Sequence, residues 1–236
     1  MRLFWRKAAK AEKAERKTNR TELVFLLDRS GSMNGLERDT IGGYNSMLDQ
    51  QKREPGEANV TTVLFDQDYE LLHDRLAISH VPPMTAKEYQ VRGCTALLDA
   101  IGMTIRRIAD VQKHTVPEKR ADKVLFVIIT DGMENASRAY TYEKVQAMVA
   151  QEKKKYGWEF LFLGANIDAI ATAARVGIGA DRAVNYHADS RGVALNYEAV
   201  SGAISHIRAC AAPMGAEWKA SIEKDFASRG THRQRR

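Results

Sequence analysis

Short apolar runs alternate along the chain with longer segments in which apolar residues recur every three or four positions. The short runs predict β-strands. They lie at residues 22–28, 59–66, 69–77, 124–130, 158–163 and 182–186. The first and fourth runs are apolar between their end positions, which is typical of strands buried on both faces of a sheet. Only Gln67 and Asp68 separate the second run from the third, and this spacing predicts a hairpin.

The longer segments predict helices, most of them placed between two strands. They lie at residues 37–53, 96–114, 141–156, 168–175 and 193–210. Strands that alternate with helices are the pattern of an α/β fold. We therefore expect a mostly parallel central sheet with one antiparallel edge strand and with helices on both faces.

The positive charge of the chain is concentrated at its ends. The 236 residues have a formal net charge of +6. Eight Lys/Arg and two Glu give residues 1–20 a charge of +6, and six Lys/Arg and two acids give residues 219–236 a charge of +4, which leaves −4 for residues 21–218. An acidic body argues against nucleic-acid binding by the body itself. We expect a basic lead-in at residues 1–20 that is helical or disordered, one domain at 21–210, and a basic tail at 211–236.

Hydropathy and cysteine content narrow the class of protein. No apolar run approaches the roughly 18 residues of a membrane helix, so no transmembrane segment is expected. Cys94 and Cys210 are too few for a disulfide framework or a four-cysteine zinc site. Leu3, Phe4 and Trp5 form only a short apolar patch, whereas a signal peptide needs an apolar core of about 7–15 residues. We therefore expect a cytoplasmic protein.

Side chains with oxygen donors follow two of the predicted central strands. Asp28, Ser30 and Ser32 come directly after the first of them, and Asp131 directly follows the other. Because the carboxyl ends of parallel strands meet at one edge of a sheet, we expect these side chains to lie close together. Thr95, at the start of a predicted helix, would add a third hydroxyl. Carboxylate and hydroxyl oxygens suit Mg²⁺ or Mn²⁺ and suit zinc poorly.

The order and spacing of these donors resemble the metal-ion-dependent adhesion site of von Willebrand factor type A (vWA) domains. The resemblance rests on a DxSxS motif, a threonine some 60 residues later and an Asp-Gly pair after an apolar strand, and it covers about residues 21–210. It implies the Rossmann-like vWA fold and a complete set of five metal-site residues. They are Asp28, Ser30, Ser32, Thr95 and Asp131.

The resemblance also implies roles for these residues. The three hydroxyls would bind the ion, and the two carboxylates would coordinate it directly or through water. An open position of the ion would then accept an acidic side chain of a protein partner. The segments DRSGSM and TDGMENAS are most similar to small intracellular bacterial members of the family, some of which are tied to stress-response operons.

Several of these residues also have an ordinary structural interpretation. Asp28 or Ser30 would cap the next helix, and the Asp131-Gly132 pair would form a turn. Arg29 would either face an incoming acid or pair with a neighbour. Each interpretation is adequate alone, but the coincidence of three separated motifs favours a metal site.

Other residues near the same edge have alternative roles. Glu134 and Asn135 would either shape a partner surface or lie in a solvated loop, and we expect the loop. Asn166 and Asp168 would either join the site or, for Asp168, cap a helix. We expect Cys94 to be a small packed residue. Three acids at the hairpin would form either a second cation site or, as we expect, a solvated turn. They are Asp66, Asp68 and Glu70.

The sequence gives little support for catalysis. The six histidines show no metal-ligand spacing, and none stands out as a base for a serine nucleophile. They are His73, His80, His114, His187, His206 and His232. Asp28 lacks the second acid two residues later that the haloacid dehalogenase motif requires, and residues 177–182 lack the lysine of a P-loop. We expect the protein not to be an enzyme.

These observations favour a binding module. We expect a metal-dependent scaffold that recognises an Asp or Glu of a protein partner through Mg²⁺ (or Mn²⁺), in a bacterial stress-response system. The alternative is binding of nucleic acid or an anionic surface through the basic ends, residues 1–20 and 219–236. A chelator would abolish only the first kind of binding.

Overall fold

The computed structural model describes residues 19–209 and 212–230 and contains a six-stranded sheet in the order β3-β2-β1-β4-β5-β6. β3 runs antiparallel to β2, and all other neighbouring strands are parallel. The expected mostly parallel sheet with one antiparallel edge is therefore confirmed. The strands are β1 (Thr21–Asp28), β2 (Ala58–Phe65), β3 (Tyr69–Ala77), β4 (Lys123–Thr130), β5 (Glu159–Ala165) and β6 (Ala183–Tyr186).

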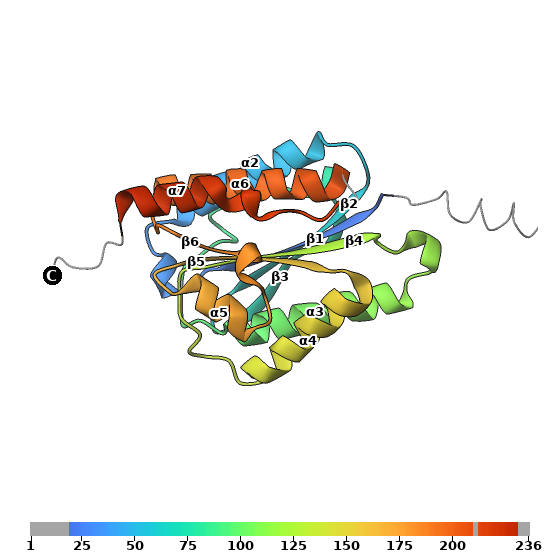
Figure 1. Ribbon diagram of the computed structural model, residues 1–236, viewed down its shortest axis with the longest axis horizontal. Helices are drawn as coiled ribbons and strands as arrows, with labels where there is room; N and C mark the ends of the chain where they lie inside the picture. The colour runs from blue at the N-terminus through green and yellow to red at the C-terminus, as the bar shows by residue number, and fades with distance from the viewer. Residues whose placement is uncertain (1–18, 210–211, 231–236) are drawn as a thin grey trace, which may run out of the picture.

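Helices cover both faces of this sheet, as Figure 1 shows. None of the helices in the described part of the chain is long and apolar enough to cross a membrane. One face carries α2 (Glu37–Lys52), α6 (Ser190–Ala209) and α7 (Ala220–Arg229), and the other carries α3 (Leu97–His114), α4 (Tyr142–Tyr156) and α5 (Ala169–Arg175). Short 3₁₀ turns join them: η1 (Gly31–Met33), η2 (Ile78–His80), η3 (Pro117–Lys119), η4 (Ala180–Arg182) and η5 (Ala216–Lys219).

The central strand β1 is apolar because both of its faces are covered. Phe25 and Leu27 belong to the core that contains residues of α2 and α6, whereas Val24 and Leu26 belong to the core on the α3 and α4 side. Each of these side chains is at most 1% exposed. Since side chains alternate between the two faces of a strand, a central strand has no position at which a polar residue meets water.

The C-terminal part of the chain contains a helix where only a basic tail was expected. Helix α7 packs against β6 and α6, with Ile222 buried beneath it. The Lys219 ammonium donates to the carbonyls of Ala180 (2.8 Å) and Ala183 (3.0 Å). The many charged residues of this segment therefore obscured, in the sequence, the apolar face of a helix. Residues 1–18 and 231–236, which contain most of the remaining basic side chains of the two ends, lie outside the described residues.

The chain order reverses at the border between β1 and β4. From β1 the chain adds β2 and β3 on one side, and from β4 it adds β5 and β6 on the other. Such a reversal opens a crevice at the carboxyl ends of the strands, because the connecting loops leave in opposite directions. We call this end of the parallel strands the carboxyl edge and the opposite end the amino edge. The carboxyl edge is where β1, β2, β4, β5 and β6 end, at Asp28, Phe65, Thr130, Ala165 and Tyr186.

Candidate metal centre

Hydrogen bonds join four of the five predicted metal ligands at the carboxyl edge. The Thr95 hydroxyl donates to Ser30 Oγ (2.9 Å), the Ser30 and Ser32 hydroxyls lie 3.2 Å apart, and the Ser32 hydroxyl donates to Asp131 Oδ1 (2.5 Å). Ser30, Thr95 and Asp131 are buried, and Ser32 is exposed. The fold thus brings three segments that are distant in sequence into one cluster that opens toward solvent at Ser32.

The fifth residue, Asp28, lies beneath this cluster and is 1% exposed. Its Oδ1 accepts from the main-chain N–H of Ser30 (2.7 Å), and its Oδ2 accepts from the Thr130 hydroxyl (2.5 Å). The Tyr89 hydroxyl donates to the Asp28 main-chain carbonyl. Both carboxylate oxygens of Asp28 are therefore engaged in holding the loop that presents the two serines.

Gly132 shows how closely the three hydroxyls surround one point. A Cβ atom on Gly132 would lie 2.5 Å from Thr95 Oγ1, 3.1 Å from Ser32 Oγ and 3.3 Å from Ser30 Oγ. The first of these distances is too short for any real side chain. The hydroxyl oxygens therefore converge over the Gly132 backbone, and glycine is needed there because any larger residue would enter the cluster.

Neither of the two carboxylates, Asp28 and Asp131, forms an ion pair with a described basic side chain. Asp131 Oδ2 is buried and has no hydrogen-bond partner among the described residues. Burial raises the pKa of Asp131 to about 6, and the nearby Asp28 charge adds to this effect, although the Ser32 hydroxyl opposes it. Burial also raises the pKa of Asp28 above its usual value, against the hydrogen bonds from Thr130 and Ser30. An unpaired buried acceptor costs about 1–3 kcal/mol, which a bound cation would offset.

The donor set fits a hard divalent cation. Hydroxyl and carboxylate oxygens are the ligand types of Mg²⁺ and Mn²⁺, and such ions keep positions for water or for an external ligand. Among residues 19–209 and 212–230, no group of three or more His, Cys, Asp and Glu side chains is placed to hold a metal. The cluster at the carboxyl edge differs from such a group because only two of its donors are carboxylates.

Two residues of the loop after Asp131 support Thr95 and helix α3. The Asn135 side-chain oxygen accepts from the Thr95 N–H (2.9 Å), and the Glu134 carboxylate accepts from the Leu98 N–H (2.9 Å). The segment is a loop and Asn135 is exposed, as expected, but Glu134 is only partly exposed, and both side chains bond to the chain at the start of α3. The N-terminus of α3 needs external acceptors because no side chain at Ala96 can cap it. Partners 36 or more positions away give no local sequence signal.

Arg29 pairs with neighbouring acids. Its guanidinium donates to Asp66 Oδ2 (2.9 Å) and to Glu70 Oε2 (2.6 Å), and Arg92 also donates to Asp66 (2.9 Å). Burial alone would raise the pKa of Asp66, but the Arg92 and Arg29 contacts lower it overall. Asp66 is fully buried, so the expected solvated turn is wrong for this residue, while Asp68 is exposed. Two guanidinium groups at Asp66 also take the place that a second cation would need.

The remaining expectations for this edge have mixed outcomes. Ser30 makes no side-chain capping bond at η1, whereas Asp168 does cap α5, accepting from the Ala171 N–H (3.0 Å). The capping interpretation of Asp168 is therefore confirmed.

Cys94 is an exposed free cysteine. The expectation that it is packed is therefore wrong, because the loop before Thr95 lies at the surface. Asn166 is exposed, with a left-handed φ of 54°, just after β5.

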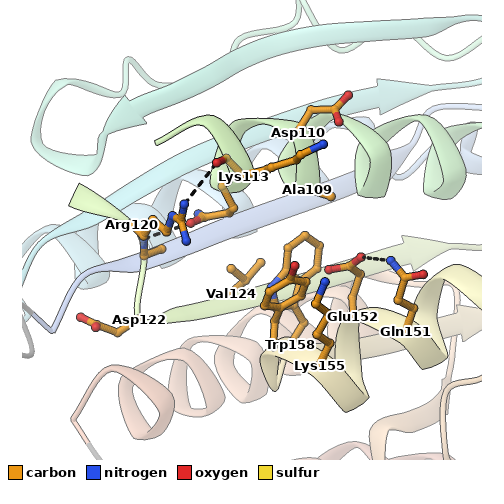
Figure 2. Close-up of a pocket in the computed structure, with 13 residues that line it drawn as sticks. Ala109, Asp110, Lys113, Arg120, Asp122, Val124, Gln151, Glu152, Lys155 and Trp158 are labelled. Carbon is orange, nitrogen blue, oxygen red and sulfur yellow. Dashed lines mark hydrogen bonds between the residues drawn. The ribbon is translucent and has the colours of Figure 1, made fainter. Parts of the chain in front are cut away.

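A cavity of about 570 Å³ lies away from the candidate centre, at the amino edge, where α3 and α4 end near the first residues of β4 and β5. Figure 2 shows hydrogen bonds among some of the polar groups that line it. Arg120 donates to the Lys113 carbonyl (3.2 Å), and Gln151 donates to Glu152 (3.2 Å). The Arg120 bond satisfies a carbonyl near the end of α3, and none of the predicted metal ligands lines this cavity.

Comparisons with known proteins agree with this architecture. No protein-family model matches the sequence, and no curated protein is similar to it. Proximal thread matrix protein 1 of the mussel byssus, with a zinc-occupied adhesion-site motif, superposes with a TM-score of 0.54 at 14% identity over 79% of this chain and 46% of that chain. The von Willebrand factor type A protein of Catenulispora acidiphila gives 0.52 at 13% identity, over 77% of this chain and 42% of that chain.

A third structure, VWA2 of Sulfolobus acidocaldarius, an ArnB paralog, superposes with a TM-score of 0.50 at 15% identity, over 77% of this chain and 44% of that chain. The chain thus spans less than half the length of these structures. At such identities the similarity concerns the fold alone. The sheet order, the antiparallel edge strand and the helices on both faces show that this chain has the Rossmann-like α/β fold of von Willebrand factor type A domains.

Proposed function

We propose that this protein is a binding module that recognises an Asp or Glu of a protein partner through Mg²⁺, or Mn²⁺, at the carboxyl edge. Ser30, Ser32, Thr95 and Asp131 would hold the ion, and Asp28 would position the serine loop or act through water. When bound, the ion supplies a positive centre with an open position for an external carboxylate.

The observation that carries this proposal is the unpartnered Oδ2 of Asp131 beside three converging hydroxyls. A cation there would pair with a buried carboxylate oxygen that has no hydrogen-bond partner among the described residues. The zinc-occupied adhesion site of the mussel protein gives further support for a divalent ion at this place in the fold. Because only two carboxylates lie at the cluster, an acidic partner would still be attracted to the ion.

The proposal is for binding without catalysis, in the cytoplasm of a bacterium. The hydroxyls of Ser30 and Ser32 bond to each other, to Thr95 and to Asp131, an arrangement that suits metal ligands better than a nucleophile aligned with an oriented base. The exposed free thiol of Cys94 suits a reducing compartment. A role in a stress response rests only on the resemblance of the DRSGSM and TDGMENAS segments to those of bacterial vWA proteins.

Binding through the basic ends remains the alternative, and the structure reduces the charge available for it. Lys219 forms an ion pair with Glu223 (2.8 Å), and Arg229 pairs with Asp189 and Asp225. Two of the six basic residues at positions 219–236 therefore hold α7 in place. The other charged residues of the ends lie mostly outside the described residues.

A pull-down from an extract of the source organism tests the proposal. Wild type, Asp131→Ala and the control Asp110→Ala, which alters an exposed acid of α3, would each be used with Mg²⁺ and with EDTA. We expect a partner retained by wild type and Asp110→Ala in Mg²⁺ and lost in every other lane. Equal retention in all lanes would contradict the proposal, and retention removed only by salt would indicate the basic ends instead.

A further inference from the structure

A second cavity, of about 790 Å³, lies at the carboxyl edge beside the candidate metal centre. The loops after β4, β5 and β6 form its walls together with helix α7. Its apolar and aromatic lining consists of Met133, Ile167, Tyr186, His187, Ala188 and Phe226. Since α7 was not expected from the sequence, this wall of the cavity could not be anticipated.

The cavity and the metal centre share one surface. Met133, which lines the cavity, follows Asp131 by two residues, so their Cα atoms are at most about 7 Å apart. β6 is the second strand from β4, and strands lie about 4.8 Å apart, so the end of β6 is roughly 10 Å from the end of β4.

Most polar side chains around this cavity are already engaged within the protein, the exposed Asn166 excepted. Asn185 accepts from the Ala169 N–H (2.8 Å), Asp168 caps α5, and Asp189 pairs with Arg229. A ligand would therefore meet mainly apolar atoms on these walls. The Tyr186 hydroxyl, buried in the wall, is an exception because it has no hydrogen-bond partner among the described residues.

The apolar lining of the cavity is exposed to solvent on the side of the metal centre. Met133 is 71% exposed, and no other large apolar side chain of the described chain is exposed as much. His187 and Phe226 are stacked, with ring centroids 4.7 Å apart, and form a flat wall. Methionine adapts its shape to a bound side chain, and exposed apolar surface of this kind is typical of interaction sites.

We propose that this cavity binds a bulky apolar side chain of the same partner segment whose acidic residue binds the metal ion. The inference rests on the proposed function, because the carboxylate anchors the segment. An extended segment rises about 3.3 Å per residue, so the roughly 7–10 Å between the two places corresponds to two or three residues. The partner motif would therefore be an acidic residue with an aromatic or large aliphatic residue two or three positions away.

Blocked synthetic peptides test this motif. Each peptide would be acetylated, amidated and fluorescently labelled, with one Asp in a Ser/Gly background and with Phe or Ser two or three positions away on either side. Fluorescence polarisation in Mg²⁺ and in EDTA would give each Kd. We expect Phe at one of these positions to lower the Mg²⁺-dependent Kd at least tenfold, which equals about 1.4 kcal/mol.

Variants of the protein then assign this gain to the cavity. Met133→Ser should remove most of the tenfold difference between the Phe and Ser peptides, and Phe226→Ala should reduce it. Met103→Ser, which changes a methionine of α3 that is 40% exposed, should leave the difference unchanged. Met133 lies in an exposed position, so its variant is expected to fold, and a thermal melt of each variant would verify this.

Two results would overturn the inference in different ways. Mg²⁺-dependent binding with equal Kd for Phe and Ser peptides, or a Phe gain that survives Met133→Ser, would contradict the apolar subsite and leave the proposed function standing. Peptides that bind equally in Mg²⁺ and EDTA, or that do not bind, would contradict both the proposed function and the subsite. A Phe peptide without Asp serves as the control for nonspecific adhesion.

Discussion

The two edges of the same sheet use their polar side chains in different ways. At the carboxyl edge, Ser30, Ser32, Thr95 and Asp131 bond mainly to one another, and one carboxylate oxygen is left over. At the amino edge, the buried Arg208 donates to main-chain carbonyls, although Glu152 Oε2 has no hydrogen-bond partner among the described residues. The buried cation of the amino edge is therefore paired within the protein, whereas the cluster of candidate ligands at the carboxyl edge contains no positive charge.

Arg208 illustrates the amino edge. It is 2% exposed and donates to the carbonyls of Gln51 (2.6 Å), Glu54 (3.2 Å) and Gly56 (3.0 Å), where the chain leaves α2 for β2. Burial lowers the pKa of Arg208 from its usual value, which the nearby Glu54 charge opposes. A buried cation surrounded by carbonyls closes a loop and has few donors left for a ligand.

The largest expected effect is the loss of this loop closure. Arg208→Ala should lower the free energy of unfolding by about 3 kcal/mol or more, because several buried carbonyls lose their donor. Urea denaturation would measure this change. The stabilisation by Mg²⁺ should persist in the variant, and Arg106→Ala, at an exposed position of α3, should change stability by less than about 0.5 kcal/mol. Loss of the Mg²⁺ effect in Arg208→Ala would show that the two edges are not independent.

The next effect should follow from replacing the Asp131 carboxylate. Mg²⁺ at 100 times its wild-type Kd should stabilise wild type by about 2.7 kcal/mol, and it should stabilise Asp131→Asn by about 1.4 kcal/mol or less because the affinity of that variant is at least tenfold weaker. In EDTA at pH 7.5, Asp131→Asn should be more stable than wild type, because a buried negative charge near Asp28 has been removed. Unfolding curves with and without Mg²⁺ test both statements, with Asp110→Asn as the control. An equal Mg²⁺ effect in both proteins would argue against Asp131 as a ligand.

A smaller effect should follow from filling the space over Gly132. Gly132→Ala should weaken Mg²⁺ binding by about tenfold or more, an effect of the size seen when groups that orient metal ligands are changed. Its Cβ would displace the Thr95 hydroxyl. Gly42→Ala in α2 is the matched control, since a Cβ there meets nothing within 4 Å and should stabilise the helix by up to about 1 kcal/mol. Isothermal titration calorimetry would compare the two, and unchanged affinity in Gly132→Ala would contradict the geometry.

The smallest effect is a pH dependence that lies outside both edges. Burial lowers the pKa of His73 from its usual value, although the Glu88 charge opposes this, and Thr62 Oγ1 lies 3.1 Å from its Nδ1. The unfolded chain then binds more protons than the folded one below about pH 6.5, so His73 makes stability fall as the pH falls through that value. Urea unfolding at pH 7.5 and 5.5 should show a weaker pH dependence in His73→Gln than in wild type. Equal pH dependence would contradict this assignment.

Sequence patterns predict the fold well where burial is simple. β1 and β4 are covered on both faces, so their unbroken apolar runs identify them, and the acids that end them or follow them mark the carboxyl edge. Helix α7 was missed because the charges of Lys219, Lys224 and Arg229 obscure its short apolar face. Helix α7 forms a wall of the cavity because it packs against β6, a contact that the sequence pattern does not indicate.

The support of the candidate centre could not be predicted from local patterns. Glu134 caps α3 from 36 residues away, and Arg29 meets Asp66 across 37 residues. Glu134 was expected in a solvated loop, and for Arg29 the sequence left open whether it faces an incoming acid or pairs with a neighbour. Residue type and spacing identified the five candidate ligands, but which oxygen is left unpaired depends on contacts that only the folded chain defines.

Binding of Mn²⁺, followed by electron paramagnetic resonance after removal of metals with EDTA, would show whether the carboxyl edge holds a metal ion. Wild type, Asp131→Asn and Glu152→Gln, a change of a buried acid at the amino edge, would be titrated side by side. We expect one Mn²⁺ per molecule for wild type and for Glu152→Gln, competed by Mg²⁺, and at least a tenfold loss of affinity for Asp131→Asn. Equal Mn²⁺ binding by all three proteins, or none by wild type, would contradict a metal centre at the carboxyl edge.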